Sequence, residues 1–267
     1  MRISRVTRIV FAVFMALGLA FIYVPLTVLV VNSFNASSTL NWPPKHFTTQ
    51  WWVRMFSNEG VRSAVSTSVV IALVATSIAL VLGTLAAAAI TRYEFFGRNT
   101  VSLLFVLPIA LPGIITGIAL NHVFTGWFGG LTFFTVVIGH ATFCIVVVFN
   151  NVAARYRRIG KSLEEASMDL GASRFTTFRE VTFPLIRSAL VAGGVLSFAL
   201  SFDEIIVTTF TAGPGQTTLP IWIYQNLFRP TQAPIVNATA AALIVLSIVP
   251  IYLAQRLSAV HTGLVNE

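Results

Sequence analysis

The sequence contains very little charge. Of its 267 residues, 10% are Asp, Glu, Lys or Arg, whereas 56% are apolar or aromatic. A soluble domain carries about 25% charged residues, so this chain could not cover a surface that faces water. The composition excludes an ordinary cytosolic enzyme, a disordered regulator and a nucleic-acid-binding module, and it leaves an integral membrane protein.

The sequence is also poor in residues that build metal and catalytic sites. Its single cysteine, Cys144, excludes an internal disulfide and a Cys/His metal cluster. The sequence has no G-x-x-x-x-G-K-[ST] loop that would bind ATP phosphates. The four histidines are scattered, and His140, inside an apolar run, is expected to be a hydrogen-bonded packing residue. We therefore expect no enzyme activity and no cofactor in this chain.

Long apolar runs are abundant, and they predict six membrane-spanning helices. A helix needs roughly 20 apolar residues to cross a bilayer, and these runs are continuous, whereas the strands of a membrane barrel alternate apolar and polar residues. The first run is longer than a signal-peptide core, and no small-x-small cleavage site follows it. The predicted spans cover residues 9–31, 66–90, 101–120, 131–153, 184–210 and 235–257.

The basic residues predict the orientation of these spans. The formal net charge is +8, from 17 Lys and Arg against 9 Asp and Glu. Cytoplasmic loops carry an excess of Lys and Arg, which places both termini inside. The inside segments then hold most of the basic residues, namely Arg2, Arg5, Arg8, Arg92, Arg98, Arg155, Arg157, Arg158, Lys161, Arg174, Arg179, Arg187 and Arg256.

One inside segment, 155–187, is long and predicts two short helices. Ser162 with Glu165 fits a capping box, Gly171 fits a helix stop, and Ser173 fits the start of a second helix. Pro184 is expected to end this piece and to start the next span. The pattern favours docking on a soluble partner, and the alternative is a basic amphipathic segment lying in the lipid interface.

This segment resembles the cytoplasmic signature of permease subunits of ATP-binding-cassette (ABC) importers. That signature is Glu-Ala-Ala, three residues, Gly, nine residues, and then two spaced apolar residues and Pro. Two positions depart mildly from it, Ser167 for Ala and Phe183 for Leu. The matching residues are Glu165, Ala166, Ser167, Gly171, Val181, Phe183 and Pro184.

The resemblance implies a type I ABC importer permease (MetI-like) fold, all-α and integral to the membrane. It implies one transmembrane domain over residues 1–267, in the bacterial inner membrane. The signature loop, residues 155–184, would then be the coupling helix that docks on a pair of cytoplasmic ATPase subunits. Those subunits would hold ATP and Mg. A second permease subunit, either a different chain or a second copy, and a periplasmic or lipid-anchored substrate-binding protein are the other implied partners.

Other segments look like the second permease subunit of spermidine/putrescine importers. They include 30–35, 107–113, 140–144 and 196–204. The resemblance implies a polyamine substrate. Gly113 departs from the acidic residue that spermidine permeases often have after the span-three proline, which also leaves another small solute as an alternative. An ion-coupled secondary transporter usually has two related halves, and this sequence shows no such internal repeat. A membrane scaffold would not need the broken third span or the acids within the membrane.

Two adjacent acids inside the fifth predicted span are candidates for the substrate path. A charged residue at mid-bilayer costs about 2.5 to 3.5 kcal/mol to insert, so Asp203 and Glu204 are not expected to face lipid. They would either contact a passing amine or form an ion pair, for which Arg229 is one available partner. Pro112 and Gly113 interrupt the third span, and we expect that break to line the path or to be a packing kink.

Overall fold

The computed structural model describes residues 4–38 and 41–262, with side chains described as far as Ser247. The predictions that concern Arg2, Arg256 and the far end of the last span lie outside the described side chains. Within the described part, the secondary structure is helical apart from one isolated bridge between Asn35 and Phe47. The chain divides into two compact units, Met1–Arg62 with Ile223–Glu267, and Ser63–Trp222.

The first unit contains α1 (Arg5–Asn32), α2 (Gln50–Ser57) and α12 (Ala233–Thr262). The apolar side chains of α1 point outward, and Phe21 is 84% exposed, as expected for a helix whose surroundings are lipid. The segment after α1 is fixed by the buried indole of Trp51, which donates to the Asn35 carbonyl at 2.8 Å.

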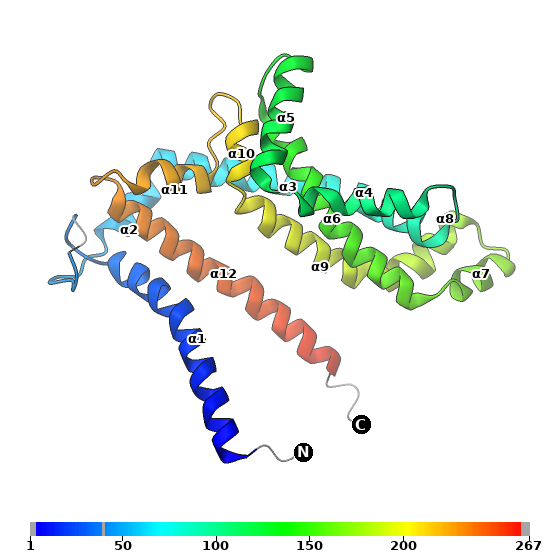
Figure 1. Ribbon diagram of the computed structural model, residues 1–267, viewed down its shortest axis with the longest axis horizontal. Coiled ribbons are helices and arrows are strands. Elements are labelled where there is room, and N and C mark those ends of the chain that lie inside the picture. Colours follow the sequence, from blue (N-terminus) through cyan, green and yellow to red (C-terminus); the bar gives the residue numbers. More distant parts are fainter. Residues whose placement is uncertain (1–3, 39–40, 263–267) are drawn as a thin grey trace. The chain divides into compact units, whose positions relative to one another are not determined.

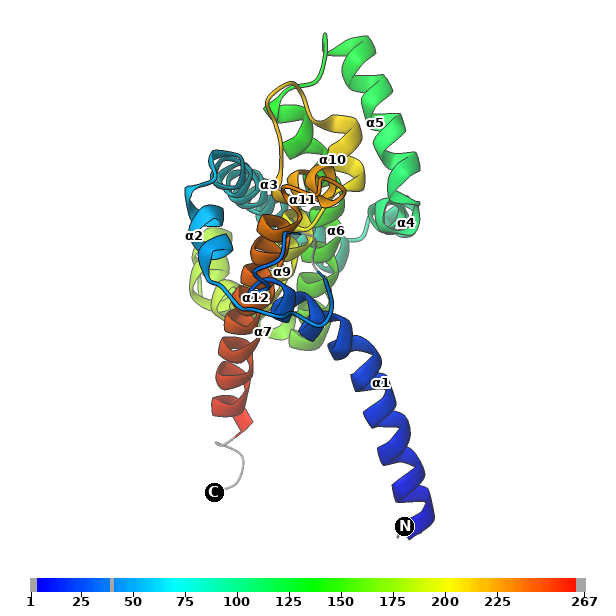
Figure 2. The same ribbon diagram turned by 90° about the vertical axis from the view of Figure 1, so that its left-hand side faces the viewer.

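The second unit carries the signature residues, His140 and the candidate path residues Pro112, Gly113, Asp203 and Glu204. It is built around α6 (Phe133–Ile159), which runs alongside α9 (Phe183–Phe202) (Figures 1 and 2). Small residues permit the close approach of these helices, since a Cβ on Gly193 would lie 3.3 Å from the Cα of Val148. The remaining elements of this unit are α3 (Glu59–Arg92), α4 (Arg98–Ala110), α5 (Gly113–Trp127), α7 (Ser162–Asp169), α8 (Arg174–Thr177), the π-helix η1 (Phe178–Thr182) and α10 (Ile206–Thr211). The boundary between the units falls within α11 (Leu219–Leu227).

The described helices account for four spans, or five if a bent pair counts as one. The four long apolar helices are α1, α3, α6 and the continuous stretch Arg174–Phe202, and α4 with α5 forms the bent pair. In α12 the described apolar part, Ala233–Ser247, is shorter than a span. The structure therefore shows an all-helical membrane protein, and the prediction of six spans is not confirmed by it.

Two predicted span ends are wrong. The polar, glycine-rich stretch after 120 is predicted to be a loop, but α5 continues through it to Trp127. Within this helix the hydroxyl of Thr125 bonds back to the Asn121 carbonyl at 2.8 Å. The fifth span was expected to reach 210, but α9 ends at Phe202 and a new helix begins at Ile206. Asp203 and Glu204 therefore lie in a break between helices.

Candidate functional site: the signature loop and two broken helices

The signature loop contains the tight turn that its sequence predicts. Gly171 follows α7 with φ at +89°. The Gly171 N–H donates to the Met168 carbonyl at 2.9 Å, and the Ala172 N–H donates to the Ser167 carbonyl at 3.2 Å. This pair of bonds is a Schellman motif, which requires a left-handed residue at the position of Gly171. Glycine adopts that conformation without steric cost.

The two predicted helix starts in the loop have different outcomes. Ser173 does cap α8, because its hydroxyl accepts from the Thr176 N–H at 3.2 Å. The capping box of Ser162 with Glu165 is wrong, since α7 is preceded by Lys161 without a side-chain cap. Ser162 is already helical, and the two glutamates in the first turn supply the negative charge that favours a helix start.

Pro184 lies in the first turn of α9, as predicted, but it does not end the piece before it. The helix runs from α8 through η1 into α9 without interruption. Proline normally breaks a helix because its ring clashes with the carbonyl four residues earlier. Here the Phe183 N–H reaches back to the Phe178 carbonyl, one residue further than in an α-helix, and this wider turn accommodates the ring.

The signature residues divide into those that hold the loop together and those that face outward. Ser167 is half-buried, and its hydroxyl lies 3.0 Å from that of Thr177, which ties α7 to α8. Val181 is half-buried in η1. The exposed members are Glu165, Ala166, Gly171, Phe183 and Pro184.

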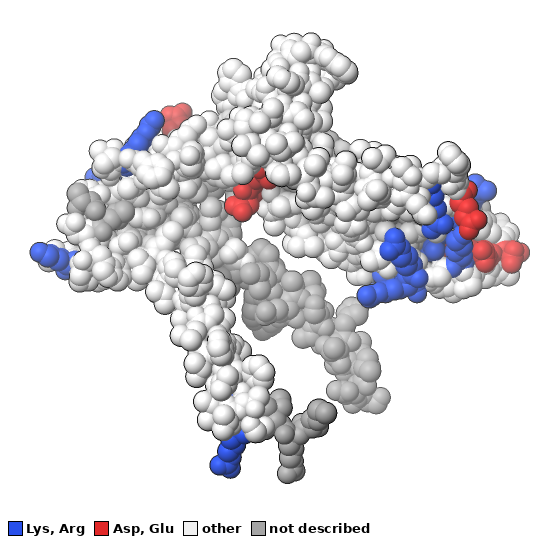
Figure 3. Space-filling view, viewed as in Figure 1, with Lys and Arg blue, Asp and Glu red and all other residues white. Residues whose placement is uncertain are grey.

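The loop presents apolar side chains next to acidic ones. Leu163, Leu170 and Phe175 are 50%, 90% and 73% exposed, and Glu165 and Asp169 are exposed beside them. Figure 3 shows that charged side chains of both signs gather over α7 and α8. An exposed apolar surface with a polar rim is typical of a protein-docking site.

The residue that anchors the loop was not predicted from the sequence. Arg92, the last residue of α3, lies with its Nε 2.9 Å from Glu164 Oε2, and its Nη2 donates to Oε1 at 3.1 Å. The two residues are 72 positions apart, so no local spacing could reveal the pair. The signature points to Glu165, whereas the anchoring carboxylate belongs to its neighbour.

Two broken helices meet on the other side of this unit. α4 and α5 form an angle of 104° at Leu111–Pro112, and α9 and α10 are separated by residues 203–205. At membrane depth, non-helical backbone is tolerated only where it is buried in protein or lines a water-filled cavity. Broken helices of this kind are where transporters place their substrate sites.

Close packing holds the two breaks together. A Cβ on Gly117 would lie 2.7 Å from the Phe210 ring, so α5 and α10 touch at a position where only glycine fits without movement. The Asn121 side chain donates to the Phe210 carbonyl at 2.6 Å. A Cβ on Gly113 would lie 3.6 Å from Ile206. The structure thus brings the predicted Pro112–Gly113 break against the start of α10.

The two acids of the break occupy different environments. Asp203 is exposed at the carboxyl end of α9, where its N–H donates to the Ala199 carbonyl at 3.1 Å. Glu204 is half-buried, and its Oε1 accepts from the Val207 N–H at 2.8 Å, so its carboxylate caps α10. Figure 3 shows an acidic group where α9 meets α10. Neither acid takes part in an ion pair among the described residues.

His140 joins the two sides of the break from α6, and the prediction of a packing histidine is confirmed. The Thr208 hydroxyl donates to the Glu204 carbonyl at 2.8 Å, so its oxygen is free to accept from His140 Nε2–H, also at 2.8 Å. Nδ1 then accepts from the Ser201 hydroxyl at 2.7 Å. The buried ring therefore links the end of α9 to α10.

We expect His140→Leu to destabilise the protein by about 2 to 6 kcal/mol, because two buried hydrogen bonds are lost at about 1 to 3 kcal/mol each. The measurement is the unfolding temperature of the purified protein in detergent. His122→Leu is the matched control, since His122 is exposed on α5. Equal unfolding temperatures for the two variants would contradict the bridging role of the ring.

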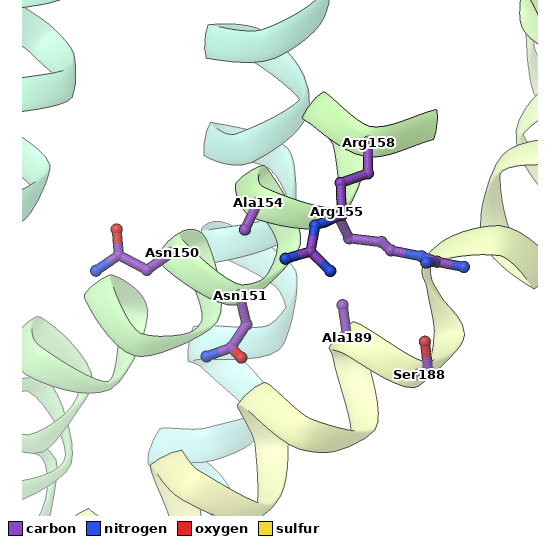
Figure 4. A pocket seen from close by; sticks show the side chains of 7 residues that line it. All are labelled: Asn150, Asn151, Ala154, Arg155, Arg158, Ser188 and Ala189. Carbon is purple, nitrogen blue, oxygen red and sulfur yellow. The ribbon is translucent and has the colours of Figure 1, made fainter. Parts of the chain in front are cut away.

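A separate cavity of about 450 Å³ lies between α6 and α9. Figure 4 shows Arg155 and Arg158 extending from α6 into the space above α9. Arg155 Nε donates to the Leu185 carbonyl at 2.8 Å. Because the cavity carries two positive charges and, among its lining residues, no acidic one, it suits an anion and not an amine. The remaining lining residues are Asn150, Asn151, Ala154, Ser188 and Ala189.

No group of three or more His, Cys, Asp or Glu side chains among the described residues could hold a metal ion. One end offers a protein-docking surface, and the break offers an exposed carboxylate.

The sequence is similar to those of known transport proteins. Residues 79–259 match the family described as "Binding-protein-dependent transport system inner membrane component". The chain is 34% identical over 240 residues to the putrescine transport system permease protein PotI of Escherichia coli K12, covering 87% of this chain and 84% of that one. It is 36% identical over 246 residues to the spermidine/putrescine permease PotC of the same organism, covering 92% of each.

A solved structure supports the fold. A bacterial ABC transporter involved in the import of the acidic polysaccharide alginate includes a chain that superposes with a TM-score of 0.72, covering 97% of this chain and 98% of that one. The sequence identity is 16%, so this likeness concerns the fold alone.

Proposed function

The chain belongs to the family of binding-protein-dependent transport system inner membrane components, and on that premise we propose that it carries a polyamine of the putrescine and spermidine class. It is a permease subunit of an ABC importer, a multi-pass inner membrane protein and not an enzyme. The observation that carries the substrate class is identity of 34% and 36%, over 87% and 92% of the chain, to permeases named for these amines.

We propose that the membrane domain has six spans with both termini in the cytoplasm. The bent pair α4 and α5 would be the third span and α12 the sixth. This orientation puts the signature loop and most of the basic residues inside.

The signature loop would dock on a cytoplasmic ATPase subunit. The exposed Glu165 and Ala166 would face the groove of that subunit, while Gly171 would make the turn between the two short helices. Ser167 and Val181 would brace the loop, with Phe183 and Pro184 at the start of α9. ATP and Mg would be bound by a pair of ATPase subunits, and a second permease, together with a substrate-binding protein, would complete the importer.

The broken helices would line half of the translocation path. A half-helix ends at Asp203, where the negative end of the helix dipole adds to the carboxylate. Both favour a protonated amine. Pro112 and Gly113 would shape the opposite wall of the path, and Glu204 would hold α10 in place.

The test is ATPase activity of the assembled complex in lipid nanodiscs, with the substrate-binding protein supplied. We expect putrescine or spermidine, bound to that protein, to stimulate ATP hydrolysis several-fold. Amino acids and sugars are the controls, and they should leave the basal rate unchanged.

Two results would overturn the proposal. Stimulation by an amino acid or a sugar, with no response to amines, would refute the substrate class. Uptake by the chain alone in liposomes, along an ion gradient and without ATP, would refute the ATP-driven mechanism.

A further inference from the structure

Arg92 contacts three separate elements at the base of the signature loop. Its guanidinium pairs with Glu164 of α7 and donates to the Gly160 carbonyl at 3.0 Å and to the Tyr156 carbonyl at 3.4 Å, beyond and at the end of α6. It also lies 4.7 Å from the centre of the Tyr156 ring, where a cation is attracted by the ring face. One side chain therefore joins α3, α6 and α7.

Both carboxylate oxygens of Glu164 have a close polar neighbour. Oε2 faces Arg92 Nε, and Oε1 accepts from both Arg92 Nη2 and the Thr182 hydroxyl, the latter at 2.9 Å. The two charged side chains are only 11% and 16% exposed. Charge-assisted hydrogen bonds of this kind, shielded from water, hold a fixed geometry.

The other described ion pair gives a contrast. Arg179 and Glu180 are neighbours in the chain, and their side chains are 73% and 65% exposed. Such an exposed ion pair contributes little to stability, and this one lies within a single element.

The contacts of Arg92 lie on both sides of Gly160, a residue between α6 and α7. Gly160, between α6 and α7, has φ at +70°, so α7 is not a rigid continuation of α6. Gly171 forms a second turn at the other end of α7. Without side-chain contacts, a force on α7 would rotate it about these two glycines and would not move the membrane helices.

From this geometry we infer that Arg92 and Glu164 are positioning residues that make α3 and α6 move together with the signature loop. The inference rests on the proposed function, in which an ATPase subunit pushes on α7. The covalent chain connects the loop to α6 and α9 only. The Arg92–Glu164 ion pair also connects the loop to α3, although the two residues are 72 positions apart in the sequence. A movement of the loop is then transmitted to α3 as well.

The experiment uses the full importer complex in proteoliposomes, carrying Arg92→Gln or Glu164→Gln. We expect both variants to bind the ATPase subunit and to hydrolyse ATP, but to take up about tenfold less substrate per ATP, since residues in a coupling network change coupling without contacting the ligands. Arg92→Glu combined with Glu164→Arg restores the ion pair and should recover part of the ratio. Arg179→Gln and Glu180→Gln are the controls, because their ion pair is exposed and joins neighbours within one element.

A spectroscopic measurement separates positioning from folding. Spin labels at the exposed Glu94 and Asp169 report, by double electron–electron resonance, the distance from α7 to the residues that follow α3. The native Cys144 is buried and need not be replaced. We expect a narrow distance distribution in the unaltered complex, with and without ATP, and a broad one in Glu164→Gln.

The outcomes are distinct. Unchanged uptake per ATP in both single variants, or an equally narrow distribution in Glu164→Gln, would overturn the role of the pair. Failure of the unaltered complex to bind any ATPase subunit would refute the proposed function, and this role with it.

Discussion

Gly171→Pro is expected to abolish copurification of an ATPase subunit with this permease. Proline fixes φ near −65°, whereas Gly171 has φ at +89° and donates its N–H to the Met168 carbonyl. The substitution therefore removes both the backbone conformation and one of the two bonds of the Schellman motif. The turn would open, and the exposed face of α7 would no longer have a fixed shape to dock. The measurement is the amount of ATPase subunit retained on the tagged permease.

The control for this prediction is Gly215→Pro. Gly215 also has a positive φ, of +78°, and also has open space around it, but it lies in the turn before α11. Proline at position 215 would also be incompatible with the local backbone conformation, but the ATPase subunit should remain bound. Full retention of the subunit by Gly171→Pro would mean that the loop docks without its turn.

The signature loop could be predicted in outline because its signals are local. Gly171 and Ser173 act through their own backbone and through residues within three positions, and both behave as their sequence indicates. The prediction that the loop piece ends at Pro184 failed because the effect of a proline depends on the turn before it. Here a π-helix precedes the proline and removes the clash. A π-helix has no sequence pattern that we could use.

The anchoring of the loop could not be predicted, because its partners are distant in sequence. Arg92 ends one helix and Glu164 begins another, and both look like ordinary charges at an inside membrane surface. Only the fold brings them together. The signature drew attention to Glu165, which is exposed, and so away from the neighbour that is paired.

The average hydropathy along the chain does not reveal the break after α9. Apolar residues continue on both sides of Asp203 and Glu204, so a window average runs across them. The two acids were a sufficient signal for a break, since one can end a helix and the next can cap another. The Pro112–Gly113 break was visible, because proline and glycine mark breaks directly, but its angle of 104° was not.

Asp203→Asn is expected to lower polyamine uptake by about 10- to 100-fold while leaving assembly and basal ATP hydrolysis intact. A hydrogen bond to a charged group is worth about 1.5 to 3 kcal/mol, and 1.4 kcal/mol corresponds to a factor of ten. Asparagine keeps the size of the side chain and removes its charge. Because Asp203 is exposed and its carboxylate caps no helix, the fold does not depend on that charge. Uptake of labelled putrescine into proteoliposomes is the measurement.

Glu204→Gln separates contact with substrate from support of the fold. The Glu204 carboxylate accepts the Val207 N–H, a bond that a glutamine carbonyl can also make, so this variant should keep most of its uptake and lose only the charge-dependent part of the cap. Replacing both acids together should abolish uptake. If Asp203→Asn transports at the unaltered rate, Asp203 is not the residue that meets the amine. If Glu204→Gln loses more uptake than Asp203→Asn, the charge that the amine requires is that of Glu204, and the assignment to Asp203 is wrong.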